Sequence, residues 1–141
     1  MDNWPSRVKI FKRMGRTILL VEDDEHALGL MAAVLSKQGH EVFQAKDGAE
    51  AKNHWSDPAR KFDLLIADVK LPGEDGFVLA EKLLETRPNV PVMFISGDRD
   101  CFASPSIRAF GDSPFIAKPF NVKQMVAAVD QVLSQTGGSE S

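Results

Sequence analysis

Four short apolar runs divide the chain into segments of similar length. None of the runs alternates with polar residues, which is typical of strands that are buried on both faces of a parallel sheet. A weaker strand pattern covers residues 41–45, between the first run and the second. The sequence therefore predicts five strands. The four apolar runs are Ile18–Val21, Leu64–Ala67, Val92–Ile95 and Phe115–Ala117.

Helical periodicity appears between the predicted strands and after the last one. Apolar residues recur there at spacings of three and four, which marks one face of a helix. A fifth candidate, Cys101–Phe110, contains Pro105, so we expect a short or irregular element there. The regular alternation of strand and helix predicts a doubly wound α/β sandwich with right-handed crossovers. The clear helical segments are 28–35, 47–56, 77–84 and 122–133.

The strand and helix pattern also sets the expected domain boundaries. Residues 17–135 carry the whole pattern and are expected to form one domain. The segment 1–16 precedes the first strand. We interpret it as a basic, disordered extension, with an amphipathic helix for a partner or a membrane surface as the alternative. The segment 136–141 is rich in glycine and serine and is predicted to be a disordered tail.

Composition narrows the class of protein. The net charge of −3 argues against direct binding of nucleic acid, although residues 1–16 alone contain five basic residues and one acidic residue. Cys101 is the only cysteine, which excludes an internal disulfide and a cysteine-based metal cluster. No apolar run approaches the roughly 18 residues that a membrane span needs, and no signal-peptide pattern opens the chain. We therefore expect a cytoplasmic protein.

Polar residues that can bind ligands or take part in a reaction follow the apolar runs. In an open α/β sheet, ligands bind at the carboxyl ends of the strands, so these residues are expected to meet at one edge. Each of them alone is more often a helix cap or a turn residue. Their coincidence at the ends of four strands favours a functional site. The residues are Glu22, Asp23, Asp24, Asp68, Ser96 and Lys118.

The chemistry that these residues suggest is phosphoryl transfer. Neighbouring carboxylates repel one another, and Mg²⁺ relieves this while leaving coordination positions for phosphate oxygens. Asp68 is a candidate nucleophile, Lys118 a candidate for neutralising the phosphoryl group, and Ser96 a candidate hydrogen-bond donor. Competing phosphate sites fit less well. The chain has no glycine-rich nucleotide loop, and Asp68-Val69-Lys70 lacks the second aspartate that aspartyl-phosphate phosphatases usually have.

At this point the motifs resemble the receiver domain of two-component response regulators, the CheY-like family. The resemblance runs from Thr17 to about Gln135 and implies a flavodoxin-like (βα)5 fold with a five-stranded parallel sheet in the order 2-1-3-4-5. The matching pieces are Ile18–Glu25, Asp68–Gly76, Val92–Gly97 and Phe115–Phe120.

The resemblance implies roles for the acidic residues. Asp68 is expected to be the phosphorylation site. Asp23 is expected to be a direct Mg²⁺ ligand, with Glu22 holding a water of the same shell and Asp24 as the alternative if the register shifts by one. The backbone carbonyl of Lys70 is expected to be a further metal ligand.

It also implies roles for residues on the last two strands. Lys118 is expected to pair with the phosphoryl group, and its bond to Pro119 is expected to be cis. Ser96 occupies the switch hydroxyl position and Phe115 the switch aromatic position. Phe115 stands where tyrosine is frequent, so a switch there must work by burial of the ring without a phenol hydrogen bond.

The expected function is that of a phosphoacceptor and not of an enzyme in the usual sense, with Mg²⁺-dependent self-phosphorylation and slow dephosphorylation. Its expected partners are a histidine kinase or histidine phosphotransfer protein and an unknown downstream protein, with the chain a monomer or a weak homodimer. Two alternatives remain open: a receiver excised from a hybrid histidine kinase, and a pseudo-receiver that binds partners without phosphate.

Overall fold

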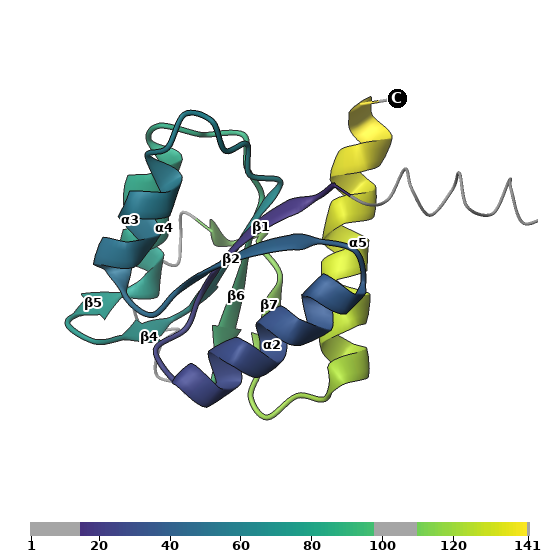
Figure 1. Ribbon diagram of the computed structural model, residues 1–141, viewed down its shortest axis with the longest axis horizontal. Coiled ribbons are helices and arrows are strands. Elements are labelled where there is room, and N and C mark those ends of the chain that lie inside the picture. The colour runs from purple at the N-terminus through teal and green to yellow at the C-terminus, as the bar shows by residue number, and fades with distance from the viewer. Residues whose placement is uncertain (1–14, 98–109, 141) are drawn as a thin grey trace, which may run out of the picture.

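A computed structural model describes residues 15–97 and 110–140, with side chains up to Gln135. Five strands form one parallel sheet in the order β2-β1-β3-β6-β7 (Figure 1). Counted along the chain, this is the predicted order 2-1-3-4-5, so the fold class is confirmed. The strands are β1 Thr17–Val21, β2 Glu41–Ala45, β3 Leu64–Asp68, β6 Val92–Ser96 and β7 Phe115–Ala117.

Four helices are described, and their starts follow from local capping. Asp24, Asp47 and Asp75 each accept backbone N–H bonds at the start of a helix. Before the last helix, the Gln124 N–H donates to Asn121 Oδ1 and the Asn121 N–H donates to Gln124 Oε1, so these two residues cap the helix. The helices are α2 Glu25–Lys37, α3 Gly48–Trp55, α4 Gly76–Leu84 and α5 Val122–Glu140.

The helices form two layers that sandwich the sheet. Helices α2 and α5 cover one face, and α3 and α4 cover the other (Figure 1). Strand β1 shows how the apolar runs serve both layers. Ile18 and Leu20 pack with α2 and α5, whereas Leu19 and Val21 pack with α3 and α4. Successive side chains of a strand point to opposite faces, so a run without polar residues is what a doubly covered strand requires.

Two segments differ from the sequence predictions, and two others lie outside the described residues. The loop after β3 forms a small antiparallel hairpin, β4 Lys70–Leu71 with β5 Glu74–Asp75, which was not predicted. Helix α5 extends to Glu140 and so includes most of the segment 136–141, for which we expected a disordered tail. A helix that packing has already nucleated extends at little cost. Residues 101–109 of the predicted irregular element, Cys101–Phe110, and residues 1–14 of the predicted extension, 1–16, lie outside the described residues.

Candidate phosphoacceptor site

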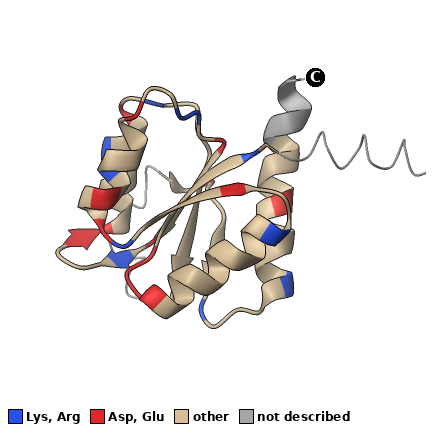
Figure 2. Cartoon of the chain, viewed as in Figure 1, with Lys and Arg blue, Asp and Glu red and all other residues tan. Residues whose placement is uncertain are grey.

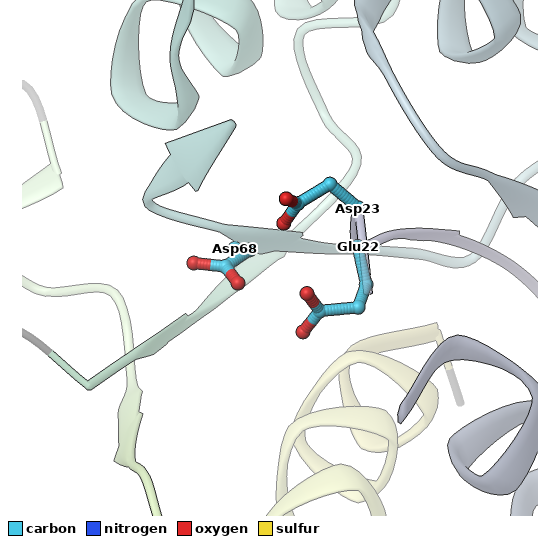
Figure 3. Close-up of side chains that lie close together, drawn as sticks. All are labelled: Glu22, Asp23 and Asp68. Atoms are coloured by element: carbon cyan, nitrogen blue, oxygen red, sulfur yellow. The ribbon is translucent and has the colours of Figure 1, made fainter. Parts of the chain in front are cut away.

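Three carboxylates gather at the carboxyl edge of the sheet. Glu22 and Asp23 follow β1, and Asp68 ends β3 on the neighbouring strand. Their oxygens lie within 4.8 Å of one another, and the side chains are drawn together in Figure 3. Glu22 and Asp68 are buried, whereas Asp23 is exposed. The acidic residues that the sequence placed at this edge therefore form a cluster that can hold a metal ion.

Lys118 reaches this cluster from the end of β7. Its ammonium lies 2.7 Å from Asp68 Oδ2 and 2.9 Å from Glu22 Oε1. Its backbone N–H donates to the Ser96 carbonyl, and its peptide bond to Pro119 is cis, as predicted. Burial alone would lower the pKa of Lys118, but its contacts with Asp68 and Glu22 raise the pKa above the usual value. The lysine is therefore held as a cation against the two buried carboxylates.

Burial disfavours the charged form of Glu22. Its side chain is fully buried, and burial raises its pKa to about 7, although the neighbouring Lys118 ammonium works in the opposite direction. Glu22 Oε1 is paired with Lys118 by distance, yet it has no hydrogen-bond partner in the described part of the chain. A buried carboxylate oxygen without a hydrogen bond is costly. This oxygen therefore fits a site that is completed by a cation or its water.

Asp68 and Lys118 border a cleft of about 430 Å³. Asp68 Oδ1 accepts the backbone N–H of Lys70 at 3.0 Å. Asp23, Ser96 and Lys118 line the same cleft, and so does Lys70. A small anion that enters the cleft therefore meets two carboxylates, one hydroxyl and two lysines.

Asp24 takes a different position from its two acidic neighbours. Its Oδ1 accepts the backbone N–H groups of His26 and Ala27 and thereby caps α2. Glu22 Oε2 in turn accepts the N–H of Asp24 at 3.2 Å. The metal-binding group found among the described residues contains Glu22, Asp23 and Asp68. The geometry therefore favours Asp23 over Asp24 as the ligand candidate.

Phe115 lies on β7 beside the strand that carries Ser96. Its half-buried ring packs against Phe94 at 5.5 Å and Phe77 at 5.8 Å between ring centroids. Phe110 contacts the same two rings. The ring is thus inside an aromatic cluster that connects β6, β7 and the start of α4.

The family profile of the response regulator receiver domain matches residues 18–130 of this chain. The chain belongs to the receiver domain family. This confirms the resemblance that the motifs at the strand ends suggested. Members of this family interact with histidine kinases or phosphotransfer proteins in two-component systems. Among the described residues, no helix is both long and apolar enough to span a membrane.

Individual relatives agree with the family assignment. The receiver protein CpdR of Brucella abortus is 30% identical over 118 residues, which cover 84% of this chain and 97% of CpdR. The sensor kinase CckA of Brucella abortus is 33% identical over 122 residues, but the match spans only 13% of CckA. The chain spans about half the length of other curated relatives that it matches. The solved receiver domain of HemR from Leptospira biflexa is 32% identical, with a TM-score of 0.75, covering 85% of this chain and 95% of that one.

One residue of this receiver site had no role in the sequence analysis. Gly76 begins α4 and donates its N–H to the Val69 carbonyl at 2.7 Å. A Cβ at position 76 would collide with the Asp68 carbonyl oxygen and come within 2.9 Å of Val69 Cα. The glycine therefore lets α4 approach the backbone that carries Asp68. A glycine directly after the helix cap Asp75 was the available signal.

Proposed function

We propose that this receiver domain accepts a phosphoryl group on Asp68 and signals through protein contacts. The observation that carries the proposal is the buried Asp68 carboxylate, which lines a cleft and lies 2.7 Å from the Lys118 ammonium. A carboxylate oxygen attacks the phosphorus of a phosphohistidine, the P–N bond breaks and an acyl-phosphate forms. Lys118 neutralises the phosphoryl oxygens, and Ser96 donates a hydrogen bond to one of them.

The carboxylates of Glu22, Asp23 and Asp68 fit a hard divalent cation. With the Lys70 backbone carbonyl they offer only oxygen ligands, and the buried Glu22 Oε1 has no hydrogen-bond partner among the residues that the structure describes. We assign the site to Mg²⁺, with Asp23 as a direct ligand and Glu22 holding a coordinated water. When bound, Mg²⁺ supplies positive charge against the phosphoryl oxygens. The Lys70 backbone N–H orients Asp68, and Lys118 places one positive charge beside it.

The test of this proposal is labelling by a small phosphodonor such as acetyl phosphate. Mass spectrometry of the intact protein is expected to show one phosphoryl group per chain, labile to acid and to alkali, when Mg²⁺ is present. Chelation of the metal is expected to abolish labelling. If the protein remains unmodified with Mg²⁺ and excess donor, it is a pseudo-receiver that binds partners without phosphate.

The pKa of Glu22 gives a prediction for metal binding. Its raised pKa means that the carboxyl is protonated and neutral below about pH 7 and charged above it. Because a cation competes with that proton, Mg²⁺ affinity is expected to be about tenfold weaker at about pH 6 than at about pH 8. Calorimetric titration at the two values measures this. Equal affinities would contradict the assignment of Glu22 to the metal site.

Replacement of Ser96 separates phosphoryl transfer from metal binding. Ser96→Ala removes the hydroxyl that we assign to the phosphoryl oxygen, and a hydrogen bond to a charged group contributes about 1.5–3 kcal/mol. The labelling rate is therefore expected to fall by about 10- to 100-fold, with Mg²⁺ affinity unchanged. Ser96→Thr keeps a hydroxyl and serves as the matched control. A wild-type labelling rate in Ser96→Ala would remove this residue from the transfer step.

The likeness to the sensor kinase CckA favours a second candidate for the phosphodonor. In this alternative the receiver takes its phosphoryl group from a kinase domain to which it is joined, with the same chemistry at Asp68. Phosphotransfer rates from isolated histidine kinases and from histidine phosphotransfer proteins distinguish the two. A donor preference of several hundredfold for a phosphotransfer protein would favour the intermolecular relay.

A further inference from the structure

A second pocket lies between the carboxyl ends of α3 and α4, which run side by side on one face of the sheet (Figure 1). Its volume is about 660 Å³, within the usual range of ligand sites. Helix α4 begins against Asp68 and ends at this pocket, so the pocket and the phosphoacceptor site occupy opposite ends of the domain. Five of the residues that line it are basic, and none is acidic.

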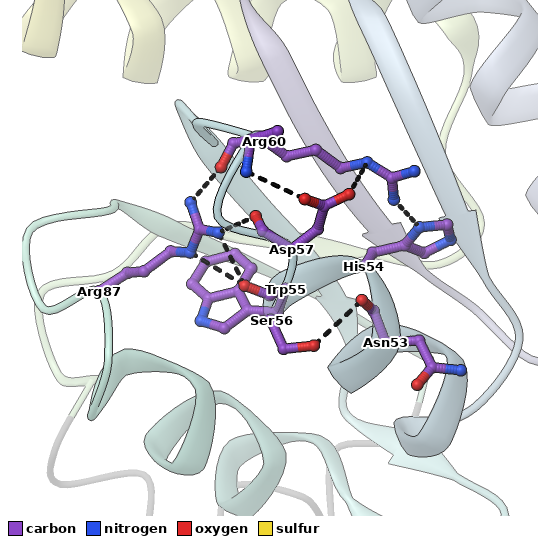
Figure 4. Close-up of polar contacts among 8 residues, drawn as sticks. Asn53, His54, Trp55, Ser56, Asp57, Arg60 and Arg87 are labelled. Carbon is purple, nitrogen blue, oxygen red and sulfur yellow. Dashed lines mark hydrogen bonds and ion pairs between the residues drawn. The ribbon is translucent and has the colours of Figure 1, made fainter.

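The wall of this pocket is fixed by Arg87 and Trp55. The Trp55 indole N–H donates to the Leu83 carbonyl at 2.7 Å and so ties the end of α3 to α4. The Arg87 guanidinium donates to the Trp55 carbonyl at 2.7 and 3.1 Å and to the Asp57 carbonyl at 2.9 Å (Figure 4). These contacts occupy carbonyls at the end of α3. Arg87 is therefore part of the wall and not a free cation.

The Arg60 guanidinium is likewise occupied by contacts within the domain. Its guanidinium lies 4.2 Å from the centre of the Phe43 ring, 3.3 Å from Asp57 Oδ2 and 2.6 Å from His54 Nδ1. Figure 4 shows its side chain extended toward His54. The pocket's capacity for a ligand therefore rests on its lysines and on its apolar floor.

Three lysines supply accessible positive charge around the pocket. Lys52 and Lys61 are exposed, and neither forms an ion pair with a residue that the structure describes. Lys82 contacts Glu74 at 3.3 Å but remains half exposed. Basic residues in the last turn of a helix often serve only to balance its dipole. That explanation covers Lys52 and Lys82 but not Lys61, which lies in a loop next to β3.

The positive charge of this pocket contrasts with the net negative charge of the chain beyond residue 16. Beyond residue 16, the chain contains 12 basic and 19 acidic residues, yet this pocket has none of the acidic ones in its lining. The ligand is therefore expected to be anionic. Phosphate groups usually bind where backbone N–H groups converge at the start of a helix. This pocket lies at helix carboxyl ends, where such donors are absent from the last turn.

We propose that the pocket docks an acidic peptide segment of a partner protein. One apolar side chain of the peptide rests on the floor near Leu83 and Trp55, and carboxylates on either side face Lys52, Lys61 and Lys82. Separate lysines around an apolar floor match carboxylates spaced along an extended chain better than they match the concentrated charge of a phosphate. The docking site is distinct from the phosphoacceptor site and does not rest on phosphorylation of Asp68.

Selection from a random peptide library displayed on phage tests this proposal on the full chain. The expected result is enrichment of peptides that combine acidic residues with an apolar residue. A synthetic enriched peptide is then expected to shift the NMR signal of the Trp55 indole N–H, which Trp55→Phe assigns. Absence of acidic enrichment, or binding that leaves this indole unchanged, would overturn the proposal.

Charge reversal gives the matched comparison. The double variant Lys52→Glu/Lys61→Glu is expected to bind the enriched peptide at least about tenfold more weakly, because two attractive charges become repulsive. The control Lys37→Glu/Lys123→Glu reverses two exposed lysines away from the pocket and is expected to bind normally. Equal weakening in both variants would reveal a general effect of net charge. If ATP shifts the Trp55 indole and no acidic peptide does, the pocket binds nucleotides and the proposal is wrong.

Discussion

Asp68→Asn is expected to abolish labelling by a phosphodonor. The amide is close in size to the carboxylate and can still accept the Lys70 N–H, but it offers no charged oxygen to attack phosphorus. Replacement also removes one of two negative charges that face Lys118 at 2.7–2.9 Å. Intact mass spectrometry after incubation with acetyl phosphate and Mg²⁺ measures the effect. The expected result is complete loss of the modification, because the acceptor itself is gone.

The control for this variant is Asp130→Asn. Asp130 is exposed on α5 and lies outside the acidic cluster, so its replacement is expected to leave labelling unchanged. Thermal unfolding of both variants shows whether the fold is kept. Labelling that persists in a folded Asp68→Asn protein would move the acceptor to another residue and contradict the proposed function.

Gly76→Ala is expected to cause the largest loss of stability among small changes near the site. The added methyl group would collide with the Asp68 carbonyl oxygen and lie within 3.0 Å of the Asp68 carbonyl carbon. These are backbone atoms of a buried strand end, and they cannot move aside as a flexible side chain does. Overpacking of this kind typically costs about 1–3 kcal/mol and sometimes more, so we expect a loss of roughly 3 kcal/mol in urea unfolding.

Gly29→Ala is the matched comparison. Gly29 is exposed in the middle of α2, and a Cβ there would contact nothing within 4 Å. Alanine in an exposed helix position is favoured over glycine by about 0.5–1 kcal/mol, so this variant is expected to gain stability. If Gly76→Ala is as stable as the wild type, α4 does not depend on close approach to the Asp68 backbone.

The fold was largely predictable because its strands are short and covered on both faces. Uninterrupted apolar runs such as Leu64–Ala67 carry apolar side chains on both faces of the strand, and this run is completely buried in the structure. The hairpin β4–β5 was not predictable in the same way. Its two strands have two residues each, too few to show a periodic pattern, and a turn at Gly73 with φ of +68° brings them together.

The candidate site was predictable as a set of residues but not in its detailed assignments. The strand ends identified Glu22, Asp68 and Lys118, which the structure brings together. The choice between Asp23 and Asp24 depended on where α2 begins. The side-chain oxygen of the capping residue accepts backbone N–H bonds and is therefore less available to a metal ion. A shift of one residue in that start would exchange the two roles, and local sequence does not fix it.

The sequence pattern could not predict features that join distant segments of the chain. The basic pocket combines Lys52 with Lys82, which are 30 positions apart, and its wall depends on Arg87 reaching the Trp55 carbonyl. The aromatic cluster around Phe115 similarly joins Phe77 and Phe94 from separate elements. Each residue alone looks like ordinary packing or a solvated charge, and only the crossover connections place them together.

The most direct test of the central claim is to locate the phosphoryl group on the wild-type chain. Labelling with acetyl phosphate and Mg²⁺, followed by borohydride reduction, converts a phosphorylated aspartate to homoserine, and peptide mass spectrometry then identifies the position. Our account predicts homoserine at Asp68 and at no other carboxylate, with none formed when the metal is chelated. Conversion at Asp23, at Glu22 or at several exposed carboxylates alike, with Asp68 unmodified, would contradict it.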